Sequence, residues 1–189
     1  MLLMNDKLDN KEYERIKFAG NIHLITSDDQ LQSYIAEITE SSLLGFDTET
    51  RPSFKKGDNF KMALLQLSND TDAYLIRLHY IRDLSPLKNV LENKNITKIG
   101  LAIRDDIKGL QKLIPFEPQS FVELQELAKS LGLKNFGLKG MTEEVLDVTL
   151  SKKAKLTNWE TKTLSSDQLT YAATDAWIGL KLYKKLKRL

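Results

Sequence analysis

Short apolar runs separated by polar turns dominate the N-terminal part of the chain. Residues 22–25, 43–47, 62–68 and 73–78 are mostly apolar, and polar or turn-forming residues bound each run. Runs of this length are typical of buried strands. Residues 69–72, Asn-Asp-Thr-Asp, have the composition of a tight turn, so the last three runs are predicted to form an antiparallel meander.

Helical spacing of apolar residues follows capping signals at several points. Residues 27–38 begin with Ser-Asp-Asp and then place apolar side chains three and four positions apart. Residues 85–91 begin with Ser-Pro, which favours a helix start, and residues 110–114 and 126–131 keep a helical pattern. Residues 164–168 carry a capping signature that opens a long final helix.

Further short strands alternate with these helices. Residues 96–100 and 121–124 are short runs that each precede a helical stretch. Helix and strand alternating after a meander is typical of an α/β protein whose helices cover a mixed sheet, here of five or six strands. The length of 189 residues fits a single domain, predicted over residues 21–189. Residues 1–20, with a weak helical pattern, are expected to form an N-terminal extension packed against it.

The composition excludes several kinds of catalytic site. The chain has no cysteine and only two histidines, which leaves little material for thiolate chemistry or a Ser-His-Asp triad. The net charge of +2 does not by itself predict a polyanionic partner. No apolar stretch reaches the ~20 residues that cross a bilayer, and the start of the sequence lacks a signal-peptide pattern. The sequence therefore predicts a cytoplasmic protein without a membrane partner.

Asp47 and Glu49 are the first candidate site residues. They stand two positions apart at the end of the apolar run 43–47, so they are expected to point to the same face of a strand. Two carboxylates held this close repel each other unless a cation offsets them, and oxygen ligands favour Mg²⁺ or Mn²⁺. For an isolated pair, one capping and one solvated carboxylate is the commoner explanation, so the assignment depends on acids elsewhere in the chain.

Further candidate acids stand near predicted helices. Asp105 and Asp106 lie in the turn from a strand to a helix, on the side where open α/β sheets bind ligands. Neighbouring positions point about 100° apart, so only one of the two is expected to face Asp47. Tyr171 and Asp175 are four positions apart on one face of the final helix, where an acid among apolar residues needs a cationic partner.

Two loops carry cations and aromatic rings suited to a phosphate-bearing ligand. Residues 51–58 follow the paired carboxylates directly, although a solvated connection explains them equally well. Residues 132–140 form a Gly-rich basic loop without the pattern of a P-loop, so no nucleotide cofactor is predicted. Lysines bind phosphates without sequence preference, and aromatic rings stack on unpaired bases. The candidates for nucleic-acid contact are Thr48, Phe54, Lys55, Lys56, Lys61, Lys134, Phe136, Lys139, Lys152, Lys153 and Lys155.

In chain order, the acidic stretches resemble the three motifs of the DEDDy group of 3'-5' exonucleases. Residues 46–50 resemble the first motif, residues 100–106 the second and residues 169–176 the third. The second motif places its acid six residues after the glycine, a register that selects Asp106 over Asp105. The chain also resembles the exonuclease domain of the Werner syndrome helicase and the catalytic domain of ribonuclease D. The resemblance implies a ribonuclease H-like fold.

The resemblance also implies an activity. The implied activity is that of a metal-dependent 3'-5' exonuclease, which would hydrolyse phosphodiester bonds from a free 3' end of DNA or RNA and release nucleoside 5'-monophosphates. Two Mg²⁺ or Mn²⁺ ions would hold the scissile phosphate and lower the pKa of the attacking water. Asp47, Glu49 and Asp175 would bind the first ion, while Asp47 would bridge to the second, which Asp106 would reach through water. Tyr171 would orient the attacking water.

Two other interpretations stay open at the level of sequence. The first is a nucleic-acid-binding or scaffold module that has the same fold and little catalysis, against which the presence of all four acids and the tyrosine argues. The second is a phosphoesterase that uses the same carboxylates on a substrate other than nucleic acid. Metal-dependent release of nucleotides from an oligonucleotide separates these alternatives from an exonuclease.

Overall fold

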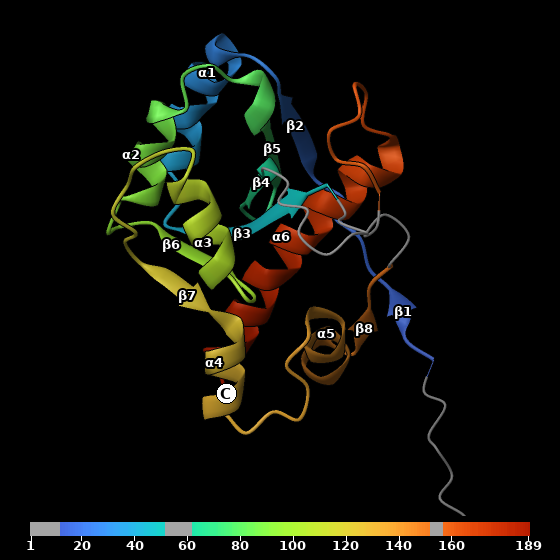
Figure 1. The fold of residues 1–189 in the computed structure, drawn as a ribbon. Coiled ribbons are helices and arrows are strands. Elements are labelled where there is room, and N and C mark those ends of the chain that lie inside the picture. The colour runs from blue at the N-terminus through green and yellow to red at the C-terminus, as the bar shows by residue number, and fades with distance from the viewer. Residues whose placement is uncertain (1–11, 52–61, 152–156) are drawn as a thin grey trace, which may run out of the picture.

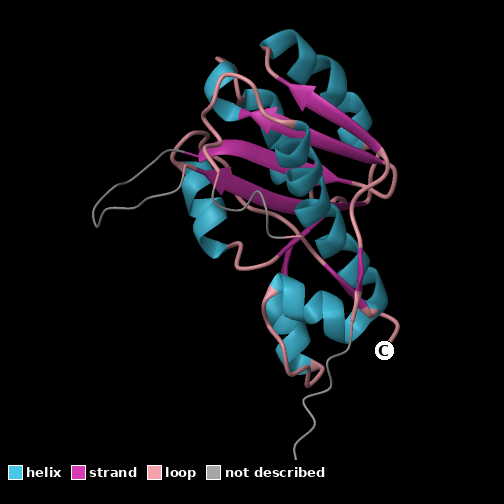
Figure 2. Cartoon of the chain, turned by 90° about the vertical axis from the view of Figure 1, so that its right-hand side faces the viewer, coloured by secondary structure: helices cyan, strands magenta, loops and turns pink. Residues whose placement is uncertain are grey.

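A mixed β-sheet with helices on both faces forms the body of the molecule (Figure 1, Figure 2). The computed structural model describes residues 12–51, 62–151 and 157–189. Within these ranges the sheet has six strands, which are β2 (Asn21–Ile25), β3 (Leu43–Thr50), β4 (Met62–Ser68), β5 (Asp72–Arg77), β6 (Thr97–Gly100) and β7 (Phe121–Glu123). Their order across the sheet is β2-β5-β4-β3-β6-β7.

The strand pairing confirms the predicted fold class. β3, β4 and β5 are antiparallel neighbours, as the predicted meander requires. β2 pairs with β5, β6 with β3, and β7 with β6, all in parallel. Parallel neighbours need crossover connections, and helices supply them here.

Helices cover both faces of the sheet. In the described ranges they are α1 (Asp28–Thr39), α2 (Lys88–Leu91), α3 (Arg104–Gln111), α4 (Leu124–Ser130), α5 (Leu138–Leu146) and α6 (Ser166–Leu186), with 3-10 turns at Leu78–Tyr80 and Ser85–Leu87. Buried residues of α1, α2 and α3 pack together on one face, whereas α6 crosses the other. None of these described helices combines the length and apolar character that a bilayer crossing needs.

Alternate side chains along β5 pack into different layers of the core. Tyr74 and Ile76 belong to the cluster beneath α1, α2 and α3. Leu75, between them in sequence, packs instead with Trp159 and Leu164 on the side of α6. Successive side chains of a strand point to opposite faces, so a continuous apolar run fills two separate cores.

A buried arginine fastens the segment before α6 to the sheet. Arg77, the last residue of β5, has an exposed fraction of 1%. Its guanidinium donates hydrogen bonds to the backbone oxygens of Trp159 at 3.3 Å, Thr161 at 2.5 Å and Lys162 at 2.9 Å. These acceptors offset part of the cost of burying a cation and fix the path of the chain into α6.

The long helix α6 begins as the sequence predicts and lies directly against β3. Its first turn has a capping box between Ser165 and Gln168. A Cβ atom built on Gly45 would lie 1.9 Å from the backbone oxygen of Ala176, much closer than van der Waals contact allows. Ala172 and Ala176 are fully buried on the helix. Small side chains on both elements therefore permit the close approach.

The N-terminal segment is extended where the sequence suggested a helix. β1 (Glu14–Arg15) pairs in parallel with β8 (Val148–Thr149), apart from the main sheet. Phe18 is buried, and its backbone N–H donates to Thr174 Oγ1 of α6 at 3.0 Å. Its ring packs edge-on against Trp177 at 5.7 Å between centroids. Pairing with β8 and burial of Phe18 outweigh the weak helical pattern.

The structure corrects the predicted loop at residues 132–140. The loop ends at Gly137, and Leu138 begins the helix α5, which the sequence analysis missed. Leu138, Met141 and Val145 carry helical spacing and pack in the same core cluster. The neighbouring glycines concealed this pattern, because Gly is unfavourable inside a helix by only ~1 kcal/mol and tertiary packing exceeds that cost.

Two helix starts also differ from the prediction. α4 begins at Leu124, immediately after β7, because the Glu123 carboxylate caps it by accepting from the N–H of Gln125. Asp105 and Asp106 lie inside the first turn of α3 instead of the turn before it. Acidic residues are favourable in a first helical turn, where the helix dipole is positive.

The contact between Gly45 and α6 predicts the effect of one methyl group. Gly45→Ala should lower the free energy of unfolding by about 3 kcal/mol, the upper end of the usual cost of overpacking, because backbone atoms on both sides must move. Denaturant unfolding monitored by circular dichroism measures the change. Gly137→Ala is the matched control, with no atom within 4 Å of the added carbon and an expected cost under about 1 kcal/mol. Equal costs for both variants contradict the prediction.

Candidate active site

Three carboxylates meet where β3 runs beneath α6. Asp47 and Glu49 come from β3 and Asp175 from α6, and all three are half-buried. One ligand oxygen from each lies within 4.8 Å of the others. The Asp47 carboxylate also accepts a hydrogen bond from the backbone N–H of Thr48 at 2.9 Å. Carboxylates this close repel one another, and a divalent cation is the natural counterion for an all-oxygen ligand set.

A second group of possible ligands, His23, Glu37 and Asp72, has a different character. His23 Nε2 lies 2.8 Å from Asp72 Oδ1 and its Nδ1 lies 3.1 Å from the hydroxyl of Tyr34. The Tyr74 hydroxyl donates to Glu37 at 2.6 Å. Both ring nitrogens of His23 and one oxygen each of Glu37 and Asp72 are thus engaged within the protein, so we interpret this group as a structural network.

Asp106 approaches β3 from the opposite side of the sheet. The Thr48 hydroxyl donates to Asp106 Oδ1 at 2.5 Å. Asp105, in contrast, has a side chain that is 95% exposed and lies 3.9 Å from Lys108. The structure therefore turns Asp106 toward Thr48 of β3, on the face opposite to Asp47 and Glu49, and turns Asp105 toward solvent.

The pKa of the Asp106 carboxyl is raised chiefly by burial. The negative charges of Asp105 and Glu123 add to this rise, whereas the hydrogen bond from Thr48 opposes it. A buried carboxylate with acidic neighbours gains from a nearby cation.

A strained turn that the sequence analysis overlooked positions Asp106. Ala102, between β6 and α3, has φ of 58°, in the left-handed region that disfavours alanine. The Glu123 carboxylate accepts hydrogen bonds from the N–H of Ala102 at 2.8 Å and of Ile103 at 2.9 Å. Glu123 thus holds the backbone conformation from which α3 starts, and a carboxylate at the end of a short strand was the only sequence signal for it.

Tyr171 lies one helical turn before Asp175 on α6, so the two side chains share one face of the helix. Burial raises the pKa of the Tyr171 phenol well above its ordinary value, and the negative charges of Asp175, Glu49 and Asp47 raise it further. Its ring lies 6.1 Å from that of Trp159. The geometry presents a neutral phenol at the edge of the carboxylate group.

Gln66, within the predicted strand at residues 62–68, is a second residue to which the sequence analysis gave no role. It pairs directly with Asp47 across β3 and β4 and is fully buried. Neither its side-chain oxygen nor its side-chain nitrogen makes a hydrogen bond to a described residue. Directly paired side chains share one face of a sheet, so this amide stands beside the carboxylate group.

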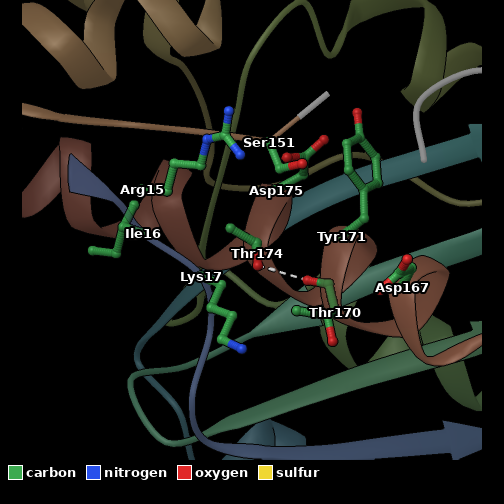
Figure 3. A pocket seen from close by; sticks show the side chains of 9 residues that line it. All are labelled: Arg15, Ile16, Lys17, Ser151, Asp167, Thr170, Tyr171, Thr174 and Asp175. Carbon is green, nitrogen blue, oxygen red and sulfur yellow. Dashed lines mark hydrogen bonds between the residues drawn. The ribbon is translucent and has the colours of Figure 1, made fainter. Parts of the chain in front are cut away.

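A hollow of about 460 Å³ opens beside Tyr171 and Asp175 (Figure 3). It is walled on one side by α6 and on the other by the N-terminal segment. The residues that line it are Arg15, Ile16, Lys17, Ser151, Asp167, Thr170, Tyr171, Thr174 and Asp175. The volume is in the range of small-molecule sites, so the carboxylate group has room beside it for a ligand.

The predicted nucleic-acid contacts are placed unequally. Thr48 lies at the site, bonded to Asp106. Lys134 and Phe136 lie in the loop before α5, and neither lines the hollow; Phe136 packs partly buried against α4 and α5, with Lys129 5.6 Å above its ring. Lys139 lies in α5, paired with Glu143. The remaining candidates fall outside the described residues: Phe54, Lys55, Lys56, Lys61, Lys152, Lys153 and Lys155.

Sequence comparison gives a family and several relatives. The family model of a 3'-5' exonuclease matches residues 22–189. The chain is 34% identical over 158 residues to the bifunctional 3'-5' exonuclease/ATP-dependent helicase WRN of Mus musculus, with 80% of this chain and 11% of that protein covered. It is 32% identical over 170 residues to ribonuclease D of Escherichia coli, with 88% and 44% covered. The chain spans about half the length, or less, of the first such relatives.

Solved structures agree with this relationship. The crystal structure of Escherichia coli RNase D superposes with a TM-score of 0.81 at 31% identity, covering 89% of this chain and 44% of that one. The Nibbler EXO domain of Aedes aegypti has the same fold, with a TM-score of 0.81, 23% identity and coverage of 94% and 92%. The family match covers most of the chain, including β3, α3 and α6, which carry the candidate acids and Tyr171. The chain therefore belongs to the family of 3'-5' exonucleases.

Proposed function

We propose that this chain removes nucleotides from the 3' end of a DNA or RNA strand by two-metal hydrolysis and releases nucleoside 5'-monophosphates. The observation that carries the proposal is the group of three half-buried carboxylates, Asp47, Glu49 and Asp175, with Asp106 turned toward the same strand. We assign the activity to one domain over residues 21–189, with residues 1–20 as its extension.

The ligand set fits two Mg²⁺ or Mn²⁺ ions, because its donors are all carboxylate oxygens. Asp47, Glu49 and Asp175 would hold one ion, and Asp47 would share the second with Asp106. When bound, such ions polarise the scissile phosphate, lower the pKa of a water and neutralise charge on the leaving oxygen. The side chains themselves would fix the positions of the ions, and the hydrogen bond from Thr48 orients the Asp106 carboxylate.

Tyr171 is proposed to orient the attacking water. A phenol whose pKa is raised stays protonated near neutral pH, so it donates or accepts a hydrogen bond without acting as a base. The place of Tyr171 beside the hollow puts it within reach of a substrate bound there.

The proposal predicts metal-dependent shortening of strands from the 3' end. Single strands and recessed duplexes of DNA and RNA, labelled at the 5' end, should shorten stepwise with Mg²⁺ or Mn²⁺ and stay intact in EDTA. Asp175→Ala should lower the cleavage rate at least about 100-fold, which is the loss expected when a group that stabilises charge in the transition state is removed. In metal-free buffer its stability should be unchanged or slightly raised, since a repelling carboxylate is lost.

Chromatography of the products identifies the released nucleotides. Cleavage that proceeds equally in EDTA, or an Asp175→Ala variant with more than about a hundredth of the parental rate, contradicts the metal-ligand assignment. A folded parental chain that cleaves none of the four substrates contradicts the proposed activity itself.

The two neighbouring aspartates should respond differently to the same substitution. Asp106→Asn is expected to lose at least about 100-fold in rate, because it removes a ligand charge from a site whose other acids remain. Asp105→Asn, the matched control, should stay within about threefold of the parental rate, because its side chain is exposed. Steady-state kinetics under saturating metal measure both. Similar losses for the two variants mean that both acids serve the second ion.

Tyr171→Phe tests the role of the phenol. The variant should lower kcat about 5- to 150-fold with little change in KM, which is the loss of ~1–3 kcal/mol from one hydrogen bond. The rise of rate with pH should keep its midpoint, because the raised pKa of Tyr171 keeps the phenol protonated across that range. If this rise in the pH–rate profile shifts or disappears in the variant, Tyr171 acts as a tyrosinate base. If the variant keeps the parental kcat, Tyr171 has no part in the site.

A further inference from the structure

The N-terminal segment brings two cations to the hollow beside the carboxylates. Arg15 and Lys17 line it opposite the helix that carries Tyr171 and Asp175. In Figure 3 both cations lie on one side of the hollow and Asp167 on the other, with Asp175 and Tyr171 between them. Both side chains are exposed, and among the described residues no carboxylate lies within ion-pair distance of either cation. Their charges are therefore available to a ligand.

The backbone of this segment is held on both sides of Lys17. The N–H of Ile16 donates to the backbone oxygen of Thr149 at 3.0 Å, next to the pairing of Arg15 with Thr149. The N–H of Phe18 donates to Thr174 Oγ1 at 3.0 Å, and the Phe18 ring is buried. The cations are thus carried on a fixed wall, which reduces the entropy lost when they bind.

Arg15 lies where two hollows adjoin. A second hollow, of about 400 Å³, is lined by Tyr13, Arg15, Lys139, Glu143, Thr149 and Leu150. Arg15 lines both hollows. A nucleic-acid strand that runs from the carboxylate group through the first hollow into the second would therefore pass the Arg15 guanidinium. Lys139 in the second hollow is paired with Glu143, which leaves Arg15 as the stronger anion-binding group of the two.

Resting on the proposed exonuclease function, we propose that Arg15, supported by Lys17, binds a backbone phosphate of the substrate strand next to the scissile one. A guanidinium presents paired donors that match two phosphate oxygens. The residues lie outside the part of the chain that the family model matches, which begins at residue 22. The N-terminal segment therefore adds a strand-binding surface of its own to the exonuclease domain.

Substrate length separates this role from a role at the scissile phosphate. A dinucleoside monophosphate contains only the scissile phosphodiester, whereas a single strand of several nucleotides also contains its neighbours. Arg15→Gln should raise KM for the longer strand roughly 3- to 10-fold with kcat unchanged, and the effect should be absent for the dinucleotide. Arg15→Lys, which keeps the charge, should recover most of the loss.

Binding in EDTA tests the same contact without the chemistry. The affinity for a labelled single strand, measured by fluorescence anisotropy over a range of salt, should fall in Arg15→Gln. The slope of log K against log salt should shrink by about 0.7, the value for one phosphate contact on a single strand. Arg188→Gln is the matched control, an exposed arginine just beyond the end of α6 and roughly 20 Å along the helix from Asp175.

The outcomes distinguish this inference from the proposed function. Unchanged binding and an unchanged salt slope in Arg15→Gln overturn the inference, even when the parental chain cleaves normally. Equal losses on the dinucleotide and the longer strand also overturn it, because Arg15 would then act at the scissile phosphate. A parental chain that binds strands through Arg15 without cleaving them supports the inference and contradicts the proposed function.

Discussion

The approach of α6 to β3 is the constraint on which the site depends. The backbone oxygen of Ala176 occupies the space that a side chain at residue 45 would need. Asp175 precedes Ala176 on the helix, and Asp47 follows Gly45 by two residues on the same face of the strand. The contact between main chains therefore lies one or two residues from a carboxylate of the group on each element, so the spacing of the carboxylates follows from steric packing.

The candidate acids lie on both faces of the sheet around the end of β3. Asp47 and Glu49 point toward α6, while Thr48 between them points to the opposite face and bonds Asp106. Glu123 in turn holds the turn from which α3 presents Asp106. Asp106 is thus oriented by neighbours outside the group of candidate metal ligands, which is how precise sites are commonly supported.

Much of this arrangement is readable in the sequence, because periodicity and motif spacing are local properties. The meander, the capped final helix and the separation of Asp106 from Asp105 follow from residues close together in the chain. The helix α5 was not predicted because the glycines within residues 132–140 favoured a loop at that place. The roles of Glu123 and Arg15 depend on pairings with residues that are distant in sequence, at Ala102 and Thr149, and no local pattern encodes them.

The anchoring of residues 159–162 by Arg77 has a consequence for how the protein can evolve. The guanidinium bonds three main-chain oxygens, and every amino acid supplies the same oxygen. Side chains at positions 161 and 162 can therefore be exchanged without releasing the loop from the sheet. The path of the chain into α6 is thus independent of these two side chains, which can change while the helix that carries Asp175 keeps its place.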